Sequence, residues 1–197
     1  AVGDVTNIPE SKRAGVARRH AAVVAENIRH IAAGGRDCFL WGHEAEQMQR
    51  LAHERSNEQY LPGLKFPERL QVLVDLDDLP ADVRDFLVVV PSHAFRSVLQ
   101  RLADDARLSP RLIAWGTKGL EMDSGLLMSE VATQVIGDSC DLVVVSGPSF
   151  AGEVARGMPT AITVASRSAT ASATVSEWLH HGNFRAYTRE DMIGVQL

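Results

Sequence analysis

The sequence predicts an α/β fold in which a doubly wound, mainly parallel sheet carries helices on both faces. Short β-branched runs alternate with longer amphipathic stretches along the 197 residues, as a parallel sheet with crossover helices requires. Segment 86–91 is continuously apolar and 141–145 is apolar after Asp141, which is typical of strands buried on both faces. The chain is 45% hydrophobic and contains neither a repeat nor a low-complexity linker, so one globular domain is expected.

The individual elements follow from apolar spacing and from glycine and proline. Apolar residues recur near every fourth position in 15–33, so this segment is expected to be a helix, which the pair Gly34-Gly35 ends. Prolines and a glycine exclude a regular element from 60–67, a loop long enough to suggest a function. The expected strands and extended pieces are 38–41, 71–76, 86–91, 111–115, 141–145, 160–165 and 184–188. The expected later helices are 43–55, 92–106, 126–136, a short one through Arg156, and 170–181.

The place of each strand in the sheet can also be predicted. Segment 86–91 is placed near the centre because it is apolar throughout, and 71–76 is placed at the outside. Ser92 is a plausible N-cap for the helix that follows the central strand.

Charge and cysteine content exclude several classes of function. The net charge is −5 with no basic block, which disfavours a nucleic-acid or membrane surface. Cys38 and Cys140 lie far apart without a CxxC spacing, so neither a zinc site nor a disulfide framework is indicated. No apolar run approaches the roughly 20 residues of a membrane span, and residues 1–30 lack a signal-peptide core. We therefore expect a cytoplasmic protein.

Three segments follow neighbouring buried strands, where open parallel sheets bind their ligands. They are Pro91-Ser92-His93, Thr117-Lys118-Gly119 and Ser146-Gly147-Pro148-Ser149, and we expect them to face one crevice. Lys118 offers an ammonium that can hold a phosphate or polarise a carbonyl, although a plain surface lysine is the alternative. The turn 146–149 offers backbone N–H groups and a hydroxyl to an anion, or is simply a helix cap with a turn proline.

Other polar residues have weaker claims to a role. His93 is interpreted as a capping or packing residue rather than a catalytic one. The acidic residues of 75–78 resemble a metal cluster, but their spacing is not that of a calcium loop, so a solvated connection is the preferred interpretation. His43 and Glu44 stand where a dinucleotide-binding fold contacts the adenosine ribose. A carboxylate there favours a free 2′-hydroxyl and His43 leaves room for a 2′-phosphate, so this pair leaves the choice open.

A series of ordered segments then resembles a known family. It comprises Leu40-Trp41-Gly42-His43, Tyr60-Leu61-Pro62-Gly63, Val88-Val89-Val90-Pro91-Ser92-His93, Trp115-Gly116-Thr117-Lys118-Gly119-Leu120-Glu121, Ser146-Gly147-Pro148-Ser149-Phe150-Ala151, Met158-Pro159-Thr160-Ala161, Phe184-Arg185-Ala186-Tyr187 and Ile193-Gly194-Val195-Gln196-Leu197. Together these segments, over about 34–197, resemble the cofactor-binding half of bacterial NAD(P)-dependent glycerol-3-phosphate dehydrogenase. The resemblance implies a Rossmann-like domain and an oxidoreductase that transfers hydride between NAD(P)H and dihydroxyacetone phosphate, giving sn-glycerol 3-phosphate for phospholipid synthesis.

The same resemblance assigns roles to individual residues. It implies that Lys118 touches both cofactor and substrate, and that Gly147 and Ser149 contact the substrate. His43 and Ala151 match cofactor contacts, while NADP or NAD remains open as the cofactor.

The chain departs from the family pattern at both ends. No GxGxxG turn is present, and the family spacing puts that turn at 19–24, where no glycine stands, so residues 1–33 are atypical. Residues 1–8 contain no apolar run, and we therefore expect the first central strand to be missing or replaced.

At the other end, the family's second lysine, the presumed proton donor, and its helical substrate domain would follow Leu197. We expect residues 1–197 alone to be inactive and to associate, either with themselves or with a helical domain. A non-catalytic anion-binding or interaction module is the alternative. A further alternative is a dehydrogenase that acts on hydroxy acids, substrates without a phosphate group. The segments around Lys118 and Ser149 disfavour this alternative.

Overall fold

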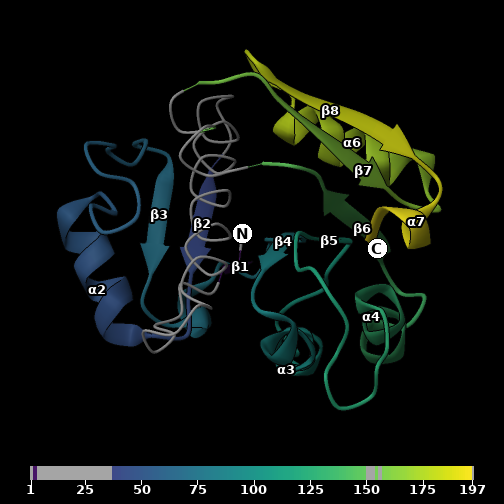
Figure 1. Cartoon of the computed structure of the whole chain (residues 1–197). Coiled ribbons are helices and arrows are strands. Elements are labelled where there is room, and N and C mark those ends of the chain that lie inside the picture. The colour runs from purple at the N-terminus through teal and green to yellow at the C-terminus, as the bar shows by residue number, and fades with distance from the viewer. Residues whose placement is uncertain (1, 4–36, 150–153, 155–156, 197) are drawn as a thin grey trace.

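The described part of the chain is organised around one sheet of eight strands in the order β3-β2-β1-β4-β5-β6-β7-β8 (Figure 1). The computed structural model describes residues 2–3, 37–149, 154 and 157–196. All neighbouring strands are parallel except β6 and β7. From β1 the order runs outward through β2 and β3 on one side and through β4, β5 and β6 on the other, which is the doubly wound arrangement.

The elements have the following bounds. The strands are β1 (Val2–Gly3), β2 (Cys38–Trp41), β3 (Leu70–Leu73), β4 (Asp85–Val89), β5 (Leu112–Trp115), β6 (Asp141–Ser146), β7 (Thr160–Ala165) and β8 (Phe184–Arg189). The described helices are α2 (Ala45–Glu54), α3 (Ser92–Asp104), α4 (Met128–Ile136), α6 (Ala169–Leu179), α7 (Met192–Gln196) and the short 3₁₀ helix Leu76–Asp78.

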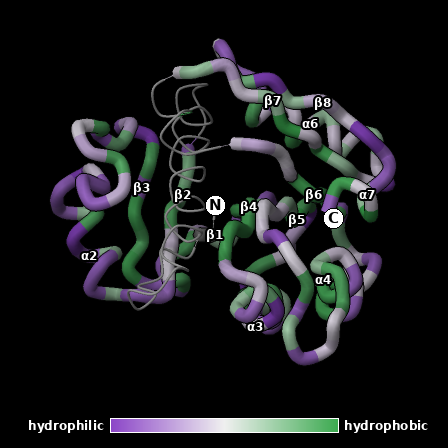
Figure 2. The backbone as a smooth tube through the Cα atoms, in the orientation of Figure 1, coloured by the Kyte–Doolittle hydropathy of each residue, from purple (hydrophilic) through white to green (hydrophobic). Residues whose placement is uncertain are grey.

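The sheet separates two hydrophobic cores, because successive strand residues point to opposite faces. On one face Phe86 and Val88 of β4 pack with buried residues of α3 and α4. On the other, Leu87 and Val89 join a core that includes residues of α2 and α6. The hydrophobic colouring of the central strands in Figure 2 reflects this burial on both sides. The Rossmann-like fold class predicted from the sequence is therefore confirmed.

Most predicted elements are present with bounds shifted by a few residues. Strands 38–41 and 160–165 have the predicted limits, and 71–76 and 86–91 correspond to β3 at the sheet edge and β4 near its centre. Helix α7 was not predicted; its five residues are too few to show a helical period.

The predicted N-cap role of Ser92 is wrong. Pro91 occupies the cap position with φ −58° and ψ 151°, Ser92 is already the first helical residue, and no side-chain cap hydrogen bond forms. A hydroxyl one position inside the helix is no longer at the N-cap, from which such a side chain reaches the free N–H groups.

The expectation of a missing or replaced central strand is also corrected. Val2–Gly3 forms a short β1 between β2 and β4, with Val2 opposite both Trp41 and Val88. Backbone pairing needs no apolar run, so two residues can fill this place. The predicted helix 15–33, the segment 19–24 and most of the short helix through Arg156 lie outside the described residues. Within the described part, no helix combines the length and apolar character needed to cross a membrane.

Candidate functional site

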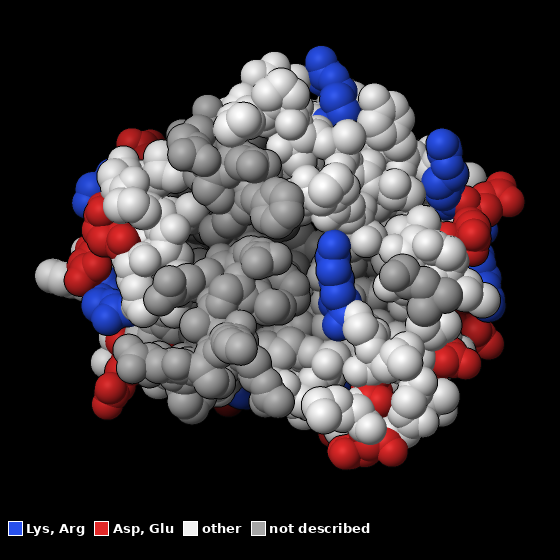
Figure 3. Space-filling model, viewed as in Figure 1, with Lys and Arg blue, Asp and Glu red and all other residues white. Residues whose placement is uncertain are grey.

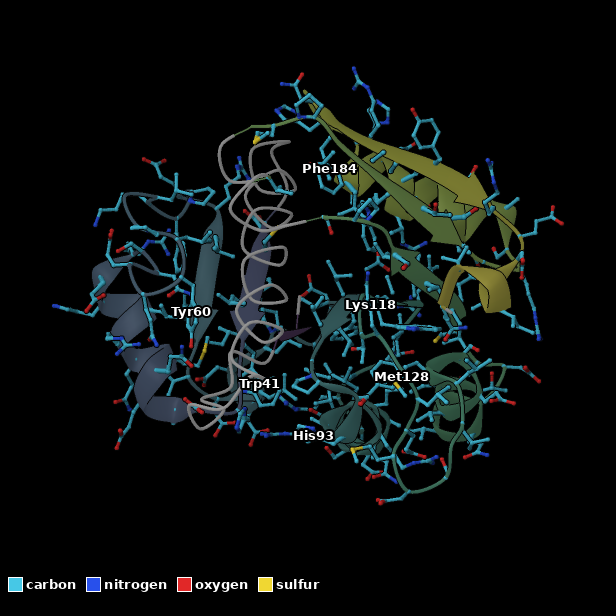
Figure 4. All side chains as sticks on the ribbon, viewed as in Figure 1. Trp41, Tyr60, His93, Lys118, Met128 and Phe184 are labelled. Carbon is cyan, nitrogen blue, oxygen red and sulfur yellow. The ribbon has the colours of Figure 1, made fainter. Side chains whose placement is uncertain are left out.

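The segments after β4, β5 and β6 meet at one edge of the sheet. These strands are parallel neighbours, with Val88 opposite Trp115 and Trp115 opposite Val144. Their carboxyl ends therefore lie side by side, as the sequence predicted. Figure 4 shows Lys118 at this edge, between β4 and β6.

Thr117 ties the end of β5 to the end of β4. Its side chain is buried, its hydroxyl donates to the Val90 carbonyl at 2.8 Å, and the Val90 N–H donates back at 3.3 Å. Gly116 N–H adds a 3.0 Å bond to the Val88 carbonyl. The backbone just before Lys118 is therefore fixed to a central strand.

Lys118, Gly147 and Ser149 come together around one carbonyl oxygen. The Lys118 ammonium donates to the Gly147 carbonyl at 3.2 Å, and the Ser149 N–H donates to the same oxygen at 2.9 Å. Lys118 itself is exposed and Ser149 is half-buried. An ammonium has three donors, so Lys118 keeps hydrogen-bonding capacity for an anion or a polarised carbonyl.

The turn at Gly147 is packed too tightly for a side chain. A Cβ at this position would lie 2.9 Å from both the Ala161 carbonyl oxygen and the Ile162 Cα of β7. Because those neighbours are backbone atoms, the turn has little room to shift. The glycine lets β6 end directly against β7, which holds the Gly147 carbonyl at the position Lys118 reaches.

The loop that continues after Lys118 is held by an ion pair. Arg96 of α3 binds Glu121 through two hydrogen bonds of 2.7 and 2.8 Å. Ser124 also donates to Glu121, at 2.5 Å. Hydrogen bonds from Arg96 and Ser124 lower the pKa of Glu121 to about 2, and the hydrogen bond with Glu121 raises the pKa of Arg96.

The sequence predicts no role for Glu121 or Arg96. Glu121 ends the family-like segment 115–121, and Arg96 lies outside every such segment. Nothing in the sequence pairs the two residues, because they are 25 positions apart.

His43, a predicted cofactor contact, follows the end of β2. Trp41 is 6% exposed, and the guanidinium of Arg101 lies 4.8 Å from its ring centroid. Asp75 pairs with Arg101 at 3.2 Å, which fixes this stack. His43 is exposed and follows Trp41. Like Lys118, it lies at the carboxyl ends of the strands, and β1 and β4 separate β2 from the strand β5 that precedes Lys118. The predicted cofactor contact Ala151 lies outside the described residues.

Two groups considered from the sequence lie apart from this cluster. His93 is exposed in the first turn of α3, and Figure 4 shows it beside that helix, away from Lys118. Asp75 and Asp77 pair with Arg101 and Arg107 on the surface. Among the described residues, no group of His, Cys, Asp and Glu is arranged to hold a metal ion.

Charge around the site is sparse. In Figure 3 most red and blue side chains lie around the rim of the molecule, and a single blue side chain stands near the middle, where Figure 4 labels Lys118. Among the described residues visible in this view, Lys118 is therefore the cation available to attract an anion at this place.

A separate hollow lies between α4, α7 and the start of β6. It has a volume of about 780 Å³ and contains Cys140, but none of the predicted site residues that the structure describes. Burial raises the pKa of the Cys140 thiol to about 11, so this group stays protonated and unreactive at neutral pH.

Comparison with known proteins gives consistent matches. The family model described as NAD-dependent glycerol-3-phosphate dehydrogenase N-terminus matches residues 20–172. A curated glycerol-3-phosphate dehydrogenase (NAD(P)+) of Vibrio cholerae is 48% identical over 168 residues, which are 85% of this chain and 48% of that protein. The Sodalis glossinidius protein of the same name is 46% identical over 168 residues, which are 85% of this chain and 49% of that protein. The chain therefore spans about half the length of the curated relatives it matches.

Solved structures agree with these matches. The crystal structure of glycerol-3-phosphate dehydrogenase from Coxiella burnetii has a TM-score of 0.81 and 39% identity, over 89% of this chain and 53% of that one. The Plasmodium falciparum glycerol-3-phosphate dehydrogenase has a TM-score of 0.80 at 16% identity, over 99% of this chain and 53% of that one, which supports the fold alone.

Proposed function

Since this chain belongs to the family of NAD-dependent glycerol-3-phosphate dehydrogenase N-terminal domains, we propose that it is the cofactor-binding part of an oxidoreductase. The resemblance found in the sequence is confirmed at the level of the family. The proposed reaction is reversible hydride transfer between NAD(P)H and dihydroxyacetone phosphate, giving sn-glycerol 3-phosphate for phospholipid synthesis. Residues 1–197 are proposed to form one NAD(P)-binding domain, with 1–33 atypical and lacking a glycine-rich turn.

One observation carries the proposal. Lys118, Gly147 and Ser149, which the family pattern assigns to the substrate, share a single carbonyl oxygen at the carboxyl edge of the sheet. This edge is where doubly wound folds bind nucleotides and their substrates.

Each of the three residues has a chemical task. The Lys118 ammonium is proposed to stabilise negative charge that develops on the substrate carbonyl oxygen. The Gly147 carbonyl orients that ammonium through the 3.2 Å bond. The Ser149 N–H holds the Gly147 carbonyl in place, and its half-buried hydroxyl is available to a polar substrate group.

The described residues fit a nicotinamide dinucleotide, which when bound would supply the hydride. The carboxyl ends of the central strands carry an exposed lysine and a glycine that allows close approach. Gly119 has a φ of +90°, and an added Cβ there would meet nothing within 4 Å. His43 and Ala151 are proposed as further cofactor contacts. The exposed position of His43 after β2 supports this role at the ribose end.

The test is a calorimetric titration of NADPH, and then of NADH, into the purified chain. Lys118→Met is expected to weaken nucleotide binding about tenfold, because one hydrogen bond to a charged group is lost. Lys65→Met is the matched control. Lys65 is likewise an exposed lysine, whose ammonium reaches the Glu54 carbonyl at the end of α2 at 3.4 Å and the Ser56 hydroxyl at 3.5 Å. Its loss should leave the affinity within about twofold.

Absence of binding by a folded chain would refute the proposal. It would instead favour a non-catalytic module that keeps the fold and an anion site around Lys118 and Ser149.

Two further points belong to the proposal. A polypeptide of residues 1–197 is expected to show no oxidation of NADPH with dihydroxyacetone phosphate, because the proton-donating lysine implied by the family pattern would follow Leu197. A cytoplasmic location is also proposed, because the sequence indicates no disulfide framework.

A further inference from the structure

We infer that Arg96 and Glu121 are positioning residues, which clamp the loop 118–126 and thereby hold Lys118 where it meets its anionic ligand. The inference rests on the proposed function for the ligand, while the clamp itself rests on contacts between described residues. Neither residue forms a hydrogen bond or an ion pair with the Lys118 ammonium, so their effect on it is indirect.

The clamp joins the loop to a rigid element. Arg96 lies in the 13-residue helix α3, and its guanidinium binds both oxygens of Glu121 at 2.7 and 2.8 Å. The same guanidinium donates to Gln134 of α4 at 2.9 Å. A two-point bond fixes direction as well as distance, so Glu121 is held in a defined orientation at α3, while Gln134 of α4 supports the guanidinium that holds it.

The loop is closed on itself around Glu121. Its N–H donates to the Leu126 carbonyl at 2.9 Å, and its own carbonyl accepts from Gly125 N–H at 2.8 Å. The Ser124 hydroxyl donates to the Glu121 carboxylate and also accepts from Leu126 N–H at 3.2 Å. The backbone and the carboxylate of Glu121 together thus tie the loop to itself, and the carboxylate ties it to α3.

Lys118 lies between two anchors. Thr117, immediately before it, is bonded to Val90 of the sheet, and Glu121, three residues after it, is bonded to α3. Only a short backbone span is free between them, and it includes Gly119 with φ +90°. Without the clamp, the loop after Lys118 would be held by its own backbone pairing and would lose its link to α3.

The ion pair between Arg96 and Glu121 is partly shielded from solvent, which strengthens its hold on the loop. The side chains of Arg96 and Glu121 are 30% and 13% exposed. Hydrogen bonds from Arg96 and Ser124 keep the Glu121 carboxylate ionised far into acid, so the clamp stays closed throughout the neutral range.

The test compares Arg96→Gln with wild type, since this change leaves the loop sequence intact. Amide hydrogen exchange is measured at Glu121 and Gly125, whose N–H groups are bonded within the loop. Exchange there is expected to become about tenfold faster, and the Kd for NADPH to rise about three- to tenfold.

Two further variants sharpen the comparison. The matched control is Arg107→Gln, because Arg107 pairs with Asp105 just beyond the far end of α3 at 2.6 Å with similar exposure, 42% and 15%. Arg107→Gln should change neither the amide exchange rates at Glu121 and Gly125 nor the Kd for NADPH. The effects of Arg96→Gln and Glu121→Gln should be less than additive in the double variant, since both changes remove the same Arg96–Glu121 interaction.

The outcomes separate the two proposals. Unchanged loop exchange in Arg96→Gln overturns the clamp, and faster exchange with an unchanged Kd overturns its effect on Lys118. If wild type binds neither NADPH nor NADH, the proposed function fails, and hydrogen exchange alone decides whether the clamp holds the loop.

Discussion

Replacing Gly147 by alanine should destabilise the protein and disturb the site at the same time. The added Cβ would lie 2.9 Å from the Ala161 carbonyl oxygen and from the Ile162 Cα, closer than real Cβ contacts. Both neighbours belong to β7, which β8 flanks on its other side along all six residues from Thr160 to Ala165. The strain therefore cannot be relieved by rotating a side chain.

The magnitude follows from the cost of forcing one methyl group into packed structure. Overpacking of this kind costs about 1–3 kcal/mol. For a chain of this length, about 2 kcal/mol would lower Tm by about 4–8 °C, and with a urea m-value of about 2 kcal/mol/M it would lower the denaturation midpoint by about 1 M.

Gly116→Ala is the matched control, measured in the same urea titrations followed by circular dichroism. The Cβ added at position 116 would lie 3.6 Å from a methyl carbon of Val89, which is an ordinary van der Waals contact. The free energy of unfolding should therefore change by less than about 0.5 kcal/mol. Equal stability of Gly147→Ala and Gly116→Ala would refute the packing argument. A nucleotide affinity unchanged in Gly147→Ala would contradict the role assigned to the Gly147 carbonyl.

Two other predictions concern the anchors on either side of Lys118. Thr117→Val should lower the free energy of unfolding by about 1–3 kcal/mol, because the buried Val90 N–H and carbonyl lose their hydroxyl partner, whereas Thr117→Ser keeps that hydroxyl and should lose less in the same urea titrations. For Glu121, the pKa falls from its ordinary value near 4.5 to about 2 on folding, so its contribution to stability is complete above pH 4.5 and is lost as the pH falls through 2. Glu121→Gln should remove this part of the pH dependence when unfolding is measured between pH 2 and 5, and an identical pH profile in the variant would contradict the shift.

The sequence alone determined every described strand except β1, and most of the described helices. Apolar runs such as 86–91 and 141–145 are local patterns, and a strand buried on both faces leaves few other places for them. The general position of Lys118 also followed, because residues after parallel strands always gather at one edge of the sheet. The N-cap prediction for Ser92 failed because proline and serine compete for the same turn, and the sequence does not show which of the two takes the cap.

Only the tertiary structure decided which groups meet. Lys118 and Gly147 are 29 residues apart, Thr117 and Val90 are 27 apart, and Arg96 and Glu121 are 25 apart. Distances along the chain carry no information on such pairs, since each depends on the register of neighbouring strands and on how helices pack against them. The two-residue β1 is the same case, because Val2 and Gly3 become a strand only when β2 and β4 offer their backbone groups on both sides. Local patterns therefore specified the elements, and long-range packing assembled the site from them.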